Sequence, residues 1–102
     1  MNLSKVSDIT AMDVAEYIHL GEVTSTEVTT LDTLIGVAKS FIMGYTGQDD
    51  LDAYQDLVIV VLVLVQDMWD NRTLYVDSNN LNRVVEAILG LHSVNLLPEE
   101  SS

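Results

Sequence analysis

Several carboxylates lie close enough together in the sequence to suggest a bound cation. One group forms a short run: Asp49, Asp50, Asp52 and Asp56. A calcium-binding EF-hand loop starting at Asp50 would need a glycine at its sixth position and a glutamate at its twelfth, and neither is present. We interpret the run as a solvated helix start, where the helix dipole favours negative charge, and we expect no metal ion there.

Asp67 and Asp70 are a second candidate, because a spacing of three residues can place both on one face of a helix. Such a pair could act in acid–base chemistry, but a di-metal helical bundle needs further ligands from other helices. His19 and His92 are the only imidazoles, and their positions relative to serine and aspartate do not suggest a catalytic triad. The glycines are scattered singly and the chain has no cysteine. We expect no enzyme, no catalytic residue and no cofactor.

The tripeptide Asp77-Ser78-Asn79 precedes a predicted helix. It is similar to the Asp-Ser-Leu attachment site for phosphopantetheine in acyl carrier proteins, which are also small, acidic and helical. In those carriers the serine opens the second helix, whereas here asparagine replaces leucine and the serine precedes the last helix. We favour a turn closed by the side chain of Asp77 or Ser78.

Trp69, Asn71 and Arg72 close the third predicted helix, and two interpretations of them stay open. Arg72 could stabilise the negative end of the helix and meet a carboxylate while Trp69 fills the core. Alternatively, the residues could anchor a contact between subunits, because Trp and Arg are enriched at interface hot spots.

Segments with helical periodicity must position these side chains. Thr10 and Asp13 predict a capping box at the start of a short first helix. Thr24 and Glu27 predict another at the start of a helix of about five turns, which ends at Gly47. The apolar stripe of this second helix consists of Val28, Leu31, Leu34, Ile35, Ala38, Phe41, Ile42 and Tyr45.

A third helix is predicted from about residue 50 to 72, with a continuous apolar run over 57–65. The valines and isoleucines of that run would also suit a buried strand, but the sequence shows no partner strand. A helix that is apolar on all sides predicts wrapping that comes in part from another subunit. Asn79 or Asn80 is expected to cap a fourth helix. The predicted fold class is therefore all-α, a small bundle of about four helices with a long buried third helix.

The chain has 102 residues, which predicts one helical domain over 1–102 with an ordered core at about 8–97. Its C-terminal tail is expected to be extended and apolar, with Leu96 and Leu97 placed to pack on a neighbour and a flexible acidic end. The hydrophobic fraction of 48% and the mean hydropathy of +0.25 are high for a small soluble protein. This apolar surplus suggests a partner surface.

The charge is strongly negative, with 4 Lys and Arg against 16 Asp and Glu, for a net charge of -12. Such a chain repels nucleic acid and anionic membranes. The run at 57–65 is far shorter than the about 20 apolar residues that a membrane span needs. The N-terminal residues lack the apolar region of a signal peptide, so a cytoplasmic location and no membrane contact are expected.

The order of these features resembles the small head–tail connector proteins of long-tailed bacteriophages and prophages, also called head completion or DNA-packaging adaptor proteins. The resemblance covers about residues 8–97. It consists of the first helix ending in AEYIHL, the stretch LIGVAKSFIMGYTG over 34–47, an apolar third helix ending in DMWDNR, a last helix with VVEAIL, and the tail HSVNLL. Ile18 and His19 depart from the leucine and arginine that are common after the tyrosine of the first helix.

The resemblance implies a structural virion protein without catalytic residues. Family members assemble as a ring, expected to be a dodecamer, beneath the portal protein, where the ring extends the channel for the genome and meets an adjacent connector or tail-completion protein. Genome DNA passes through without specific binding. The candidate assembly interface consists of Trp69, Asn71, Arg72, Tyr75, Leu96 and Leu97. The implied location is the head–tail junction of the virion, after assembly in the bacterial cytoplasm.

Two other functions stay open at this point. The chain could be a generic acidic helical module or regulator that occupies a basic protein by mimicking the charge of DNA. It could also be an acyl-carrier-like protein modified on Ser78.

Overall fold

In the computed structural model, which describes residues 5–93, the first two α-helices start at the predicted capping boxes. Helix α1 spans Ala11–Tyr17, and the Thr10 hydroxyl accepts a hydrogen bond from the backbone N–H of Asp13 while the Asp13 carboxylate accepts one from the backbone N–H of Thr10. Helix α2 spans Ser25–Thr46 and begins with the same reciprocal pair between Thr24 and Glu27. Each pair satisfies two backbone donors that the first turn of a helix leaves without partners.

The C-terminal end of α2 is closed by polar contacts inside the protein. Gly47 takes the predicted left-handed conformation, with φ of 73°, and its N–H donates to the carbonyl of Met43. Thr46 is fully buried, and its hydroxyl donates to the carbonyl of Ile42 at 2.7 Å and accepts from the N–H of Gln48. The two hydrogen bonds offset the cost of removing this hydroxyl from water, and they fix the end of α2.

The third helix is shorter at its N-terminal end than the sequence predicts. Helix α3 spans Leu57–Asn71, and the preceding residues form a separate 3₁₀ turn, η2, at Leu51–Ala53. Asp50 caps η2 by accepting from the N–H of Asp52 at 3.1 Å. Within the acidic run, Asp50 therefore caps this turn, and Asp56 is the residue that precedes α3.

The fourth helix, α4, spans Arg83–His92, and its cap also differs from the prediction. Asn82, rather than Asn79 or Asn80, accepts from the backbone N–H groups of the first turn, with the shorter bond at 2.8 Å from Val84. Each of these asparagines has the chemistry of a cap, and the turn around Asp77 engages the two earlier ones.

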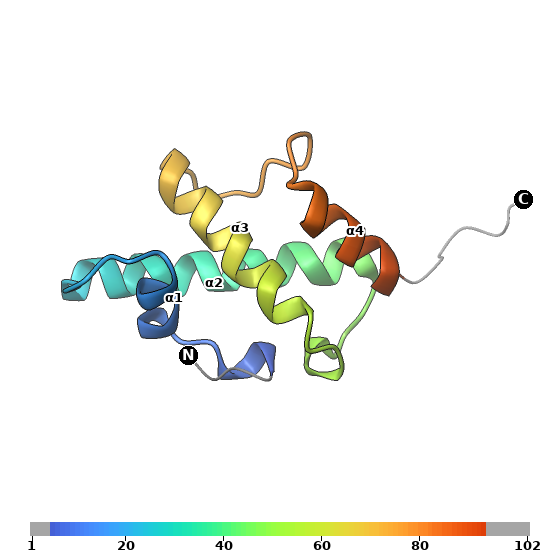
Figure 1. Cartoon of the computed structure of the whole chain (residues 1–102), viewed down its shortest axis with the longest axis horizontal. Helices are drawn as coiled ribbons and strands as arrows, with labels where there is room; N and C mark the ends of the chain where they lie inside the picture. Colours follow the sequence, from blue (N-terminus) through green and yellow to red (C-terminus); the bar gives the residue numbers. More distant parts are fainter. Residues whose placement is uncertain (1–4, 94–102) are drawn as a thin grey trace, which may run out of the picture.

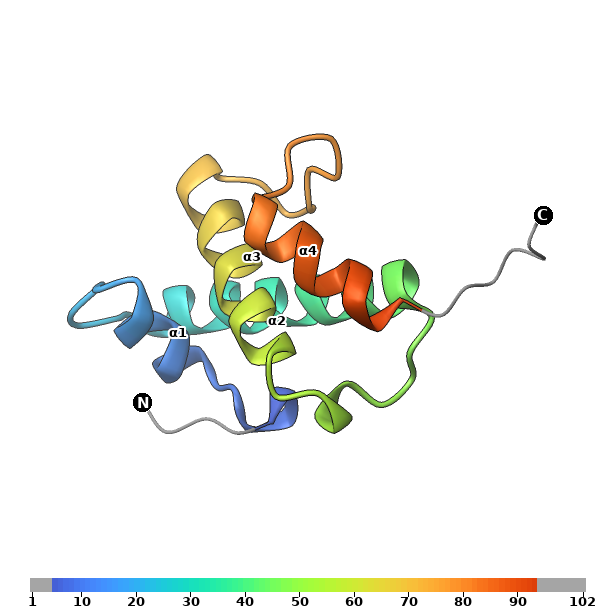
Figure 2. The ribbon, with the colours of Figure 1, turned by 45° about the vertical axis from the view of Figure 1, so that its right-hand side comes forward.

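Helix α2 forms the long axis of the molecule, which measures 51 × 27 × 20 Å (Figure 1). Helix α3 crosses α2 near its middle, α1 packs beside the N-terminal half of α2, and α4 packs toward its C-terminal end (Figures 1 and 2). A short 3₁₀ helix, η1, at Val6–Asp8 packs against η2, where the N–H of Ser7 donates to the Asp52 carboxylate at 2.8 Å. None of the helices in residues 5–93 is both long and apolar enough to cross a bilayer.

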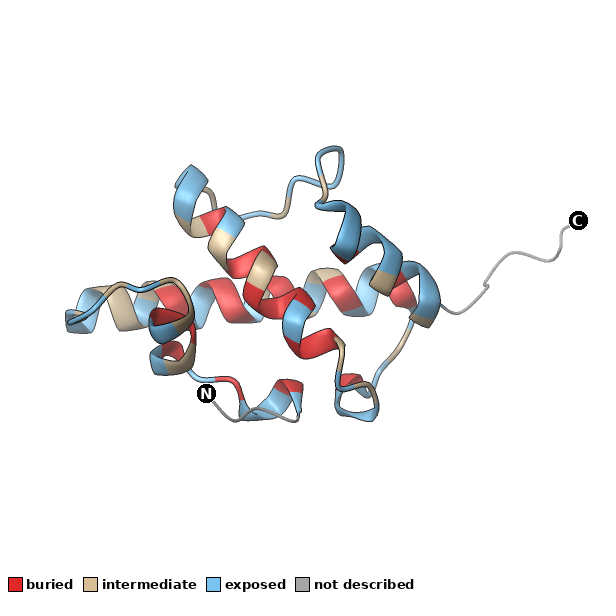
Figure 3. Ribbon diagram, viewed as in Figure 1, coloured by how far each residue is buried: buried red, intermediate tan, exposed pale blue. Residues whose placement is uncertain are grey.

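The core lies where α3 crosses the other helices (Figure 3). Its fully buried large side chains come from all four α-helices and η1; they are Val6, Val14, Leu31, Leu34, Ile42, Leu57, Val60, Val61, Leu64, Val65, Val85 and Leu89. Within the apolar run of α3, Val63 is half-buried and Ile59 is exposed, with half of its surface in contact with water. The all-helical fold class is thus confirmed across the described residues. Leu96, Leu97 and the acidic end of the chain lie outside them.

Candidate assembly surface

The C-terminal end of α3 brings together an exposed cation and an aromatic ring. Arg72 ends the helix in a left-handed conformation, with φ of 58°. Its guanidinium lies over the half-buried ring of Trp69, at 5.9 Å from the ring centroid. At this distance a cation is attracted by the electron-rich face of the ring, so the two side chains stabilise each other's orientation.

The segment after α3 leaves two large apolar side chains in solvent. Leu74 and Tyr75 are 65% and 64% exposed. The Thr73 hydroxyl donates to the carbonyl of Tyr75 at 3.3 Å, which ties the start of the segment together. Exposed leucine and tyrosine side chains side by side are a common feature of surfaces that bind another protein.

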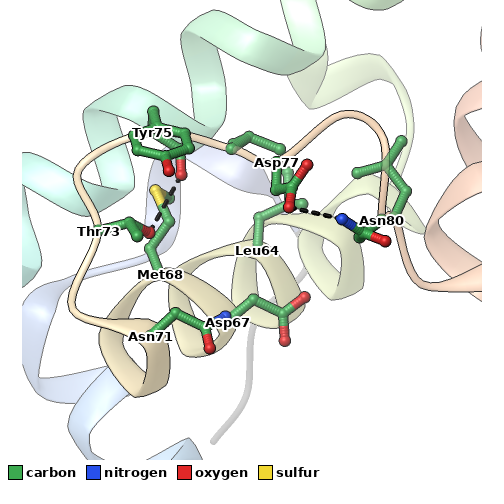
Figure 4. Close-up of a pocket in the computed structure, with 10 residues that line it drawn as sticks. Leu64, Asp67, Met68, Asn71, Thr73, Tyr75, Asp77 and Asn80 are labelled. Carbon is green, nitrogen blue, oxygen red and sulfur yellow. Dashed lines mark hydrogen bonds between the residues drawn. The ribbon is translucent and has the colours of Figure 1, made fainter.

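A pocket of about 330 Å³ lies on one side of this segment, between α3 and the loop over residues 73–80. Leu64, Met68, Val76 and Leu81 supply its apolar wall, and the loop arches over the helix so that the side chains of Tyr75 and Asp77 face those of Asp67 and Asn71 (Figure 4). Partial burial and then the nearby Asp70 carboxylate raise the pKa of Asp67. The Asp67 carboxyl therefore holds its proton more tightly than a free aspartate does.

A groove of about 340 Å³ lies on the other side, between the N-terminal half of α2 and the end of α3. Trp69, Arg72 and Leu74 line it together with residues of α2. Met68, which is buried, lines both hollows. The end of α3 and the segment after it thus border two hollows. We call the bordering residues the assembly surface: Trp69, Arg72 and Leu74 line the groove, and Asn71 and Tyr75 line the pocket.

Four of the six residues predicted for an assembly interface line these two hollows, Trp69 and Arg72 the groove and Asn71 and Tyr75 the pocket. The other two, Leu96 and Leu97, lie outside the described residues. Leu74 is the member of the assembly surface that the sequence prediction did not include. The sequence carries no signal that separates Leu74 from Val76 of the same interval, which packs against the core.

The other candidate residues lie in separate parts of the fold, where several of them have local hydrogen-bond partners. No group of three or more histidine or acidic side chains within residues 5–93 is arranged to hold a metal ion. In the acidic run, hydrogen bonds from the hydroxyl and backbone N–H of Ser7 lower the pKa of Asp52. Asp77 accepts from the backbone N–H of Asn79 at 3.1 Å and from the Asn80 side chain at 2.7 Å, which is the predicted Asx turn beside Ser78.

The two histidines have different environments. His19 takes a left-handed conformation, with φ of 59°, in the turn after α1. His92 is half-buried at the end of α4, and its Nε2 lies 2.7 Å and 2.9 Å from the two carboxylate oxygens of Asp56. The His92 ring also packs on Tyr54, with the ring centroids 4.1 Å apart. This contact joins the start of α3 to the end of α4, and no local sequence signal indicates it.

Comparison of the chain with protein families, with curated proteins and with solved structures found no match.

Proposed function

We propose that this chain is a structural subunit of a head–tail connector of a long-tailed bacteriophage or prophage. In this proposal it forms a ring, expected to be a dodecamer, beneath the portal protein, extends the DNA channel and joins the head to the next connector or tail-completion protein. The observation that carries the proposal is the assembly surface, where Leu74 and Tyr75 are exposed beside the stacked Trp69 and Arg72. The choice of a connector over other protein-binding roles comes from the resemblance of the sequence over about residues 8–97 to that family.

The residues at the assembly surface suit a contact between subunits. Trp, Tyr and Arg side chains contribute most to binding when a partner excludes water from around them. The hollows on either side of the surface provide places for side chains of a neighbour. We place Trp69 and Arg72 at or near the seam between subunits, and the loop over residues 73–80 against the portal or the adjacent ring.

The net charge of -12 supports a conduit rather than a DNA-binding protein. The affinity of a protein for DNA comes largely from contacts between its lysine and arginine side chains and the phosphates, and this chain has only 4 such residues. DNA would therefore slide past an acidic lumen without sticking. The same charge opposes ring closure, because each subunit repels its neighbours until salt screens them or a portal template holds them.

The test is to follow association by sedimentation while salt rises from about 0.1 M to about 1 M, over which the Debye length falls from about 10 Å to about 3 Å. We expect a monomer at low salt and association that strengthens with salt, with open-centred rings in negative-stain images of concentrated protein. Association that weakens as salt rises would contradict the electrostatic reasoning. A protein that stays a discrete monomer or dimer and binds a basic protein tightly at low salt would instead be a charge-mimicking module.

Two variants locate the seam. Tyr75→Asp places a charge on the assembly surface, and Ser40→Asp places the same charge at an exposed position of α2. We expect Tyr75→Asp to abolish rings and Ser40→Asp to retain them under the same salt conditions. Equal effects of the two substitutions would show that net charge, and not this surface, controls assembly. A gain of phosphopantetheine mass on Ser78 after treatment with a transferase would indicate a carrier protein instead.

A further inference from the structure

A third hollow lies away from the assembly surface, between the start of α3 and the end of α4. It is a shallow groove of about 650 Å³ whose exposed surface is mostly apolar. Its lining residues are Ala53, Tyr54, Gln55, Asp56, Val58, Ile59 and His92. Ile59 is 51% exposed, although most of the apolar run of α3 around it is buried. Water therefore contacts a large aliphatic side chain at a position where the helix is otherwise covered.

The two ionisable groups at the rim of this groove, His92 and Asp56, already bind each other. His92 binds both carboxylate oxygens of Asp56 through its Nε2 and packs on the ring of Tyr54. The backbone carbonyl of His92 accepts a hydrogen bond from the Gln48 side chain at 2.8 Å. Since these groups satisfy each other, the groove offers an occupant chiefly apolar surface. An aliphatic segment suits it better than an ion or a polar ligand.

The chain itself supplies such a segment, because an apolar stretch follows shortly after His92 in the sequence. His92 is part of the lining, and the residues that follow Ser93 are Val94, Asn95, Leu96 and Leu97. His92 contacts Asp56, and Ile59 lies about one helical turn further along α3, a rise of about 5 Å. Four residues in extended form can span about 13 Å, so the segment after Ser93 is long enough to reach Ile59. We propose that residues 94–97 dock on the groove of their own chain, with a leucine side chain covering Ile59.

The geometry favours the segment of the same chain over that of a second copy. A tether of a few residues gives the attached segment an effective concentration in the millimolar range. A second copy would have to approach against a net charge of -12 on each chain. Docking also requires only a few residues to be ordered, so the loss of chain entropy is small relative to that of a long loop.

This inference does not rest on the proposed connector function. If that function also holds, docking within the chain keeps Leu96 and Leu97 away from neighbouring subunits until assembly displaces them. A ring that never forms would refute the connector and leave the docked segment intact. A segment that does not dock would leave the connector proposal unchanged.

An engineered disulfide tests the proposal cleanly, because the chain has no cysteine of its own. The variant Ile59→Cys with Leu97→Cys retains Leu96, and the control Met12→Cys with Leu97→Cys places the first thiol on α1, at the other end of α2. Under mild oxidation we expect the first pair to form a disulfide within one chain, seen as a faster band on a non-reducing gel, and the control pair to form none. A disulfide-linked dimer, or no disulfide in the first pair, would overturn the proposal.

A second measurement does not depend on thiol geometry. In NMR spectra of the whole chain, Leu96→Asp with Leu97→Asp should shift the methyl resonances of Ile59, because the docked leucines are removed. The matched control, Glu99→Gln with Glu100→Gln, changes charge nearby without removing apolar surface and should leave these resonances in place. Unchanged Ile59 resonances in the leucine variant would refute docking, as would equal shifts in both variants.

Discussion

The contact between Asp56 and His92 allows a sharp prediction about stability. Asp56 precedes α3 and His92 ends α4, so His92→Ala removes the contact that joins these two helix ends. The His92 side chain is 17% exposed and the Asp56 side chain 41% exposed, which places the pair between the surface and the interior. A carboxylate only accepts hydrogen bonds, so the Nε2–H of His92 is the donor.

The expected magnitude follows from this partial burial. A hydrogen bond to a charged group contributes about 1.5 to 3 kcal/mol when it is shielded from water, and exposed pairs of polar side chains contribute about 0.2 to 1 kcal/mol. Solvent screening at the more exposed Asp56 places the pair near the lower range, at about 1 kcal/mol. The lost packing on Tyr54 adds about 0.5 to 1 kcal/mol. We expect His92→Ala to lower the free energy of unfolding by about 2 kcal/mol, which lowers Tm by roughly 10 °C for a domain of this size.

The assay is urea unfolding of the wild type, His92→Ala, Asp56→Ala and the double variant, all at the same pH. The double-mutant cycle removes the effects of each substitution on helix propensity and on the dipole of α3, and it isolates the energy of the pair. We expect a coupling free energy of about 1 kcal/mol. A coupling within about 0.3 kcal/mol of zero would show that the contact contributes no stability, and the reasoning from distance and burial would then be wrong.

Further predictions concern a helix cap, a carboxylate and the core. Thr24→Ala should cost about 1 kcal/mol in urea unfolding because it removes the cap of α2, whereas Thr29→Ala, whose hydroxyl bonds only within the helix, should cost less than about 0.5 kcal/mol. Burial and Asp70 raise the pKa of Asp67 above 3.8, so the folded state holds that proton more tightly and stability falls as pH rises through the folded-state pKa. Asp67→Asn should therefore stabilise the protein by a few tenths of a kcal/mol at pH 7 and give no gain near pH 3, where the wild-type carboxyl is protonated in both states; a gain of equal size at both pH values would contradict this account. Leu89→Ala should cost about 2 to 5 kcal/mol, measured as a shift in the urea midpoint, because it leaves a cavity at a fully buried position.

Local chemistry explains which parts of the fold could be predicted. Thr10 and Thr24 form the expected capping boxes, and Gly47 takes the expected left-handed conformation, because each depends on residues within one helical turn. The start of α3 could not be predicted in the same way. Asp52 accepts from Ser7, which is 45 positions away, and a contact of that range leaves no pattern in the neighbouring residues.

The sequence indicated which residue types belong to the candidate site, but it did not indicate the hollows that these residues line. Trp69 and Arg72 stood out because of their chemistry, and their stacking follows from helical spacing. The hollows beside them depend on how the loop over residues 73–80 returns across α3, which no periodicity indicates. The pairing of His92 with Asp56 was missed for the same reason, since the two residues are 36 positions apart.

Helix α3 has a mechanical consequence for the two surfaces at its ends. Its 15 residues form a rod of about 22 Å that is buried over most of its length. The assembly surface lies at one end of the rod, and the groove that contains Ile59 lies at the other. Because a close-packed core resists deformation, we expect α3 to shift as a single body, so a change of occupant in the groove would alter the position of Trp69 and Arg72.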